Sequence, residues 1–191
     1  YLSFRTISTI LKIKYPEGTI LNVYGAMQPP DNSPGTQYMF CGQHSCKVSE
    51  KGYLYLFNNG CFEGKPPSVV MMRQPEGPTD SLKKIWEYSL EAADVKSKAD
   101  RIVQLTMGGN VIELPDNSVF VSMSVPYNNV FITDLAKHIL WQGIPEKWDA
   151  AGHIWKTSAH YRASIINNSK EMERLIWNSA KWETDKKAEQ R

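Results

Sequence analysis

Two consecutive glycines, Gly108 and Gly109, separate two short runs of alternating apolar residues, 102–107 and 110–114. A two-residue hairpin turn needs positive φ angles, which glycine adopts without steric cost. The pattern therefore predicts a β-hairpin. The turn signal Pro115–Ser118 and the apolar run 119–125 add a third strand. Because strands joined by such short turns pair antiparallel, this meander constrains the fold more than any other feature of the chain.

Other segments divide between strand and helix patterns. Runs of β-branched and aromatic residues predict strands at 19–24, 37–41, 52–57 and 68–72, between loops rich in Pro, Gly and Asn. Apolar residues at helical spacing predict helices instead at 80–99 behind a capping Asp80, at 129–142, at 145–167 from Pro145 onward, and at 168–183. The same spacing favours a short helix at 3–14, where the many β-branched residues make a strand the alternative.

This element order predicts the α+β class, with a mixed or antiparallel sheet, a central helix and a Trp-rich helical C-terminal third. We expect residues 1–126 to form an α+β sheet domain. Residues 127–191 are expected to form a helical arm that packs on this domain or extends from it. A chain of 191 residues that is 41% hydrophobic is long and apolar enough to build such a core.

Charge and hydropathy disfavour two classes of partner. The chain has 22 basic and 20 acidic residues, a net charge of +2, whereas nucleic-acid binding is dominated by basic patches. No apolar run approaches the roughly 18 residues that a transmembrane helix needs. Because the chain begins with Tyr1 rather than Met, we expect residues upstream. A signal peptide, a membrane anchor and a tag are all compatible with that start, and the sequence predicts no localisation.

The three cysteines and one histidine lie close together in the sequence. A tetrahedral zinc site needs four ligands of these types, and the chain supplies Cys41, His44, Cys46 and Cys61. Cys41 and His44 have the two-residue gap of metal knuckles, but only one residue separates His44 from Cys46, and no second ligand pair follows. A disulfide, either Cys46–Cys61 or Cys41–Cys46, and simple packing of unreactive thiols are the alternatives.

The same residues carry the alternative hypothesis of a small cysteine- or metal-dependent enzyme. A nucleophilic cysteine would need a base such as His138, His153 or His160 beside it. On a helix from Pro145, four side chains would share one face and could bind a metal or move a proton: Glu146, Asp149, His153 and His160. An ordinary charged surface explains the same stripe, and no catalytic motif is complete.

Tryptophan is concentrated in the C-terminal third, which holds five of the six. Trp148 and Trp155 are seven residues apart and would share one helical face. Tryptophan anchors protein interfaces more often than its abundance predicts. Packing within the protein's own core explains most of this aromatic pattern, because large and small side chains on one face let another helix approach closely. The remainder predicts a partner-binding surface formed by Trp148, Trp155, Trp177 and Trp182. Stacking of single-stranded nucleic acid on these rings, with Lys156, Arg162 and Lys181 nearby, is a second alternative that the small net charge disfavours.

Together these observations predict a non-enzymatic interaction or assembly subunit. It would dock a protein partner, or a second copy of itself, through an aromatic-rich helical surface. The only cofactor that the sequence suggests is zinc at the cysteine cluster.

Overall fold

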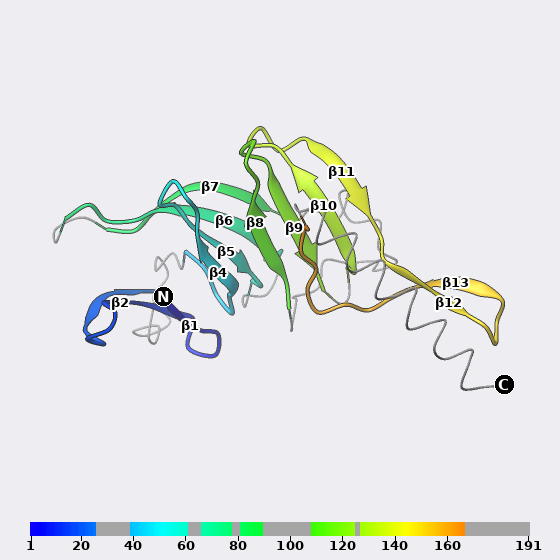
Figure 1. Ribbon diagram of the computed structural model, residues 1–191, viewed down its shortest axis with the longest axis horizontal. Coiled ribbons are helices and arrows are strands. Elements are labelled where there is room, and N and C mark those ends of the chain that lie inside the picture. Colours follow the sequence, from blue (N-terminus) through cyan, green and yellow to red (C-terminus); the bar gives the residue numbers. More distant parts are fainter. Residues whose placement is uncertain (26–38, 61–65, 78–80, 90–107, 125–126, 167–191) are drawn as a thin grey trace.

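The computed structural model describes residues 1–25, 39–60, 66–77, 81–89, 108–124 and 127–166. Throughout these ranges the regular structure is β: thirteen strands form four antiparallel sheets (Figure 1). Three sheets make the body of the protein, and the fourth is a two-stranded hairpin that projects from it (Figure 1).

The strands follow one another in simple meanders. The N-terminal sheet contains β1 (Leu2–Phe4), β2 (Thr9–Ile13) and β3 (Ile20–Tyr24). The central sheet contains β4 (His44–Val48), β5 (Leu54–Asn58), β6 (Ser68–Arg73) and β7 (Lys83–Ser89). The outer sheet contains β8 (Asn110–Glu113), β9 (Val119–Met123), β10 (Asn129–Thr133) and β11 (Ile139–Gly143). The projecting hairpin is β12 (Glu146–Asp149) and β13 (Ile154–Thr157).

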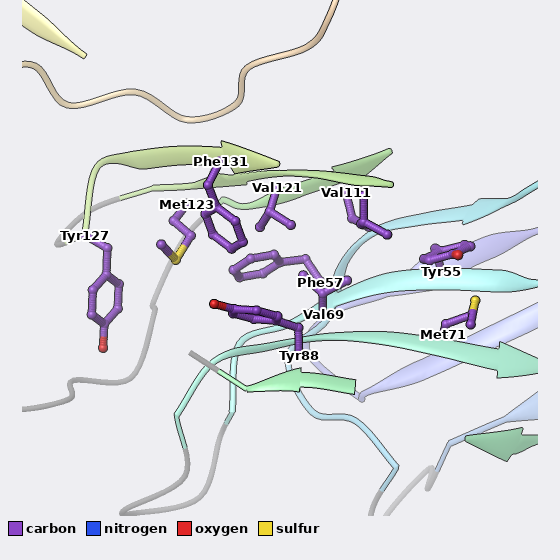
Figure 2. Close-up of a cluster of buried hydrophobic side chains, with 11 residues drawn as sticks. Tyr55, Phe57, Val69, Met71, Tyr88, Val111, Val121, Met123, Tyr127 and Phe131 are labelled. Carbon is purple, nitrogen blue, oxygen red and sulfur yellow. The ribbon is translucent and has the colours of Figure 1, made fainter. Parts of the chain in front are cut away.

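The main core lies between the central and outer sheets. Phe57, Val69 and Tyr88 reach from the central sheet toward Val121 and Phe131 of the outer sheet (Figure 2). The Tyr88 and Phe131 rings pack with their centroids 5.4 Å apart. Burying each such side chain contributes about 1.5–3 kcal/mol, so this aromatic cluster is the main attraction between the two sheets.

The opposite face of the central sheet forms a second core. Leu54, Leu56, Val70 and Met72 alternate with the residues of the main core and pack with Ile10 and Tyr24 of the N-terminal sheet. Strands β5 and β6 are therefore buried on both faces. This explains why their sequences are almost continuously apolar, because a strand covered on both sides has no face to keep polar.

The predicted α+β class is wrong, because the described part of the chain contains no helix. The predicted helix 3–14 is replaced by β1 and β2, and β7 occupies the described part of the helix 80–99. Strands β10 and β11 replace the helix 129–142. The helix from Pro145 is replaced, as far as residue 166, by the hairpin β12–β13 and a segment without regular secondary structure. The helix 168–183 and the strand 102–107 lie outside the described residues.

Five strand predictions are confirmed where the structure describes them: 19–24 as β3, 52–57 as β5, 68–72 as β6, 110–114 as β8 and 119–125 as β9. The strand predicted at 37–41 is not formed at residues 39–41, and β4 was not predicted. The division at residue 126 stays a prediction, although the central part of the outer sheet, β9 paired with β10, spans that position.

Helical spacing misleads in the segment 129–142 for a local reason. Its first residues, Asn129–Thr133, are mostly β-branched or aromatic, and they pair with β9 along their whole length. The chain then turns, because the Asp134 carboxylate accepts a hydrogen bond from the His138 backbone N–H at 2.8 Å and Lys137 adopts a positive φ of 74°. A tight turn of this kind ends any helix and starts a hairpin.

Candidate partner-binding hairpin

The hairpin β12–β13 places two of the predicted partner-binding residues side by side. Trp148 and Trp155 are directly opposed in its register, so both indoles lie on one face. Their ring centroids are 5.6 Å apart and the ring planes meet at 64°, an edge-to-face contact. Trp148 is 49% exposed and Trp155 is 62% exposed. The pair thus keeps about half of its surface open to a partner.

Local interactions hold the hairpin in shape. The Asp149 carboxylate accepts a hydrogen bond from the Ala151 N–H at 3.2 Å and forms an ion pair with Lys156 on the opposite strand. The Lys156 ammonium lowers the pKa of the Asp149 carboxyl below its usual value. His153 adopts a positive φ of 49° in the turn, and its ring packs against Trp148. At the base, the Ser158 N–H donates to the Pro145 carbonyl at 2.7 Å.

The segment 158–166 ties the hairpin to the body of the protein; we call it the return segment. Ser124 Oγ donates to the His160 carbonyl at 2.8 Å, and the Ala163 N–H donates to Ser122 Oγ at 3.0 Å. The Asn110 side-chain amide donates to the Ala163 carbonyl at 2.8 Å. Ser122 is fully buried, so these bonds fix the chain against the outer sheet.

Two histidines at the return segment should make its anchoring sensitive to acid. Burial lowers the pKa of His160, whose Nε2 lies 3.1 Å from Ser122 Oγ, and a backbone hydrogen bond with Ser158 opposes this shift with a smaller effect. The pKa of His44, packed edge-on against Tyr161, is lowered by burial and by the charges of Arg5 and Arg162. Since both folded-state pKa values lie below the 6.5 of a free histidine, the unfolded chain binds more protons below that pH.

We therefore expect the thermal unfolding midpoint to fall as the pH is lowered from about 7 to about 5, below the ordinary histidine pKa of about 6.5. Circular dichroism melts across this range measure the effect. The double variant His44→Asn/His160→Asn should show a flatter dependence because neither titrating group remains. An equally steep dependence in that variant would assign the effect to other groups.

The cysteine cluster does not form a zinc site among the described residues, where no group of three or more His, Cys, Asp or Glu side chains is placed to hold a metal ion. Cys46 is a free thiol that packs against the second core, and burial raises its pKa to about 11. Both disulfides predicted from the spacing include Cys46 and are therefore not formed. Cys41 is disulfide-bonded. Cys61 lies outside the described residues.

The described residues lend the enzyme hypothesis no support. The raised pKa of Cys46 is opposite to that of a reactive thiolate. The predicted stripe of Glu146, Asp149, His153 and His160 required a helix. In the hairpin, Glu146 and Asp149 lie on opposite faces, and His160 lies beyond β13 in the return segment. His138 forms an exposed pair with Asp134 through Nδ1 and Oδ2, 2.9 Å apart.

Trp177 and Trp182, the other predicted partner-binding residues, lie outside the described residues. No helix within the described ranges has the length and apolar character of a membrane span. The chain matches no protein-family model, no curated protein and no solved structure.

Sequence reasoning identified the tryptophans but missed the structure that presents them. The segment 149–153 contains the sequence signal for this turn, because Asp149 and Gly152 are residue types that favour turns. In the structure the Asp149 carboxylate binds the turn backbone, and His153 adopts a positive φ. Two β-compatible segments flank this turn, each with one tryptophan. A spacing of seven residues is therefore as compatible with a hairpin pair across this turn as with one helical face.

Proposed function

We propose that this protein is a non-enzymatic interaction or assembly module that docks a protein partner through the hairpin β12–β13. The observation that carries the proposal is the exposed edge-to-face pair Trp148–Trp155 on a hairpin that projects from the body of the protein (Figure 1). The three-sheet body acts as the support, and the hairpin presents the contact surface.

Physical chemistry favours this use of the pair. Large exposed aromatic side chains leave apolar area in water that a partner can bury. Indoles have few rotatable bonds, so ordering them on binding costs little entropy, and here each already restrains the other. The Asp149–Lys156 ion pair and the Pro145–Ser158 hydrogen bond hold the backbone beneath them. The hairpin is therefore organised for contact before a partner arrives.

The test removes the indoles without disturbing the cores. In the double variant Trp148→Ala/Trp155→Ala, we expect partner affinity to fall about thirtyfold or more, the usual effect of losing an anchor residue. Trp141→Ala is the matched control, because Trp141 is 52% exposed but lies on β11, outside the hairpin. Both variants should unfold within about 0.5–1 kcal/mol of wild type, since none of these residues belongs to a core.

Two measurements give the answer. Quantitative mass spectrometry of proteins retained from lysates of the producing cells identifies those kept by wild type and Trp141→Ala but lost by the double variant. Titration calorimetry with the purified candidate then compares the three dissociation constants. Sedimentation velocity does the same for self-association. If the folded double variant keeps every partner, and its own oligomeric state, with unchanged affinity, the hairpin is not the docking site and the proposal is wrong.

A further inference from the structure

In the part of the chain that the structure describes, no strand pairs with the outer edge of β12. Within the described residues, β12 and β13 pair only with each other. Hydrogen-bonded and non-hydrogen-bonded pairs alternate along an antiparallel ladder. The Ser158 N–H donates to the Pro145 carbonyl, so Pro145 and Ser158 face each other as a hydrogen-bonded pair. Trp148–Trp155 is the third pair after that one, and the alternation therefore makes it a non-hydrogen-bonded pair. The backbone N–H and C=O of Trp148 therefore point outward, to the free edge of β12, where an additional strand can bond to them.

The charges on β12 select one kind of strand. When two identical strands pair antiparallel about a twofold axis, one residue must face its own copy, since side chains alternate between the two faces. Centring the pairing on Glu146, Lys147 or Asp149 would bring two identical charges together. Centring it on Trp148 places Lys147 opposite Asp149 of the second copy, twice by symmetry, and no like charges meet. The edge is therefore self-complementary in one register.

The charges along the edge of β13 favour symmetric pairing with a second copy less than those of β12 do. Pairing centred on Trp155 would place Ile154 opposite Lys156 of a second copy and would gain no opposite-charge pair. Pairing centred on Lys156 would bring two ammonium groups together. Cross-strand pairs of opposite charge stabilise a sheet and like pairs destabilise it. The charges thus favour β12 over β13 as the edge of a symmetric contact.

We propose that the partner of this hairpin is a second copy of the chain, bound through antiparallel pairing of β12 with β12 around Trp148. This inference rests on the proposed function and specifies its partner. The product is a four-stranded sheet, β13–β12–β12–β13, with four indoles in one row on one face. On the other face, Lys147 of each copy contacts Asp149 of the other. A two-stranded hairpin is only marginally stable, and two further strands reinforce it.

Charge exchange tests this register. Lys147→Glu would place Glu opposite Asp149 of the second copy, and Asp149→Lys would place Lys opposite Lys147. We expect each variant alone to self-associate about tenfold more weakly than wild type, because two attractive pairs become repulsive. A mixture of the two variants restores both pairs and should form heterodimers of wild-type affinity. Sedimentation equilibrium of each protein and of the mixture, with one variant labelled, measures the three constants.

A fold control accompanies the test. The paired indoles give an exciton couplet in circular dichroism, which reports whether the hairpin persists. Asp149→Lys loses its bond to Lys156, so wild type mixed with Lys147→Glu provides a second measurement that does not depend on it. Its affinity should lie between those of the two homodimers, because one of the two charge pairs remains attractive.

The outcomes separate this inference from the proposed function. A wild-type chain that stays monomeric at millimolar concentration overturns the β12 pairing, as does a dimer unaffected by Lys147→Glu. In either case a different protein partner that depends on Trp148 and Trp155 would still support the proposed function. Dimerisation that responds to the charge exchange but not to Trp148→Ala/Trp155→Ala would support the edge pairing and count against the indoles as anchors.

Discussion

Replacing Phe57 by alanine is expected to lower the free energy of unfolding by about 3–5 kcal/mol. The ring is fully buried in the main core and faces the outer sheet, in the cluster that contains Tyr88 and Phe131 (Figure 2). Both sheets close around it, so the surrounding side chains can fill only part of the cavity. The loss therefore combines buried apolar area with missing contacts.

Urea denaturation followed by circular dichroism measures this effect. Phe4→Ala is the matched control, since it makes the same chemical change at a residue of β1 that is 42% exposed. Its cost should stay within about 1 kcal/mol. If both substitutions cost the same, the packing of the central sheet on the outer sheet described above is incorrect.

Gly109→Ala is expected to cost about 2–4 kcal/mol, for two reasons. Gly109 has a φ of 97°, a conformation that residues with a side chain adopt only with strain. An added Cβ would also lie 2.7 Å from both Cγ and Cε1 of the Phe57 ring, far closer than van der Waals contact. Because β8 begins at the next residue, the chain cannot move away without disturbing the outer sheet.

The two contributions can be measured separately. Gly52 has a similar φ of 82°, but nothing lies within 4 Å of an added Cβ, so Gly52→Ala reports the backbone strain alone. Gly109→Ala should cost more by the energy of the ring clash. That excess should shrink by about 1 kcal/mol or more when Phe57 is also alanine, a coupling that a double-mutant cycle measures. Equal costs at Gly52 and Gly109 would show that the Phe57 ring does not pack against Gly109.

The confirmed strand predictions share a physical basis. Residues 52–57 and 68–72 are rich in aromatic and aliphatic side chains, which favour strands, and are bounded by the turn-forming residues Gly, Asn and Pro. Composition and flanking residues therefore both predict a strand. The meander after Gly109 is confirmed for the same reason. Local preference and tertiary burial coincide in these segments, because both faces of β5 and β6 need apolar residues.

The helix predictions failed where short apolar patterns fit two periods. Trp86 and Tyr88 pack on the main core from alternate positions of β7, although Leu82, Ile85 and Trp86 also suit a helical face. An amphipathic helix needs a free surface to cover. The segment 83–89 instead pairs with β6 along its length, and the hydrogen bonds of that ladder outweigh a weak helical preference.

In the candidate site, too, some features follow from the sequence and others only from tertiary contacts. The sequence by itself determined that tryptophan gathers near the C-terminus, and that Trp148 and Trp155 are spaced so as to share a face. It also determined the antiparallel pairing of β8 with β9, because the turn residues 115–118 and alternating apolar residues act over a few neighbouring positions. Only the tertiary structure decided that the shared face belongs to a hairpin that pairs with no other described strand, since no local signal records which strands a hairpin will meet. Partial burial of Cys46, which raises the pKa of that thiol, is likewise decided by contacts between residues far apart in the chain.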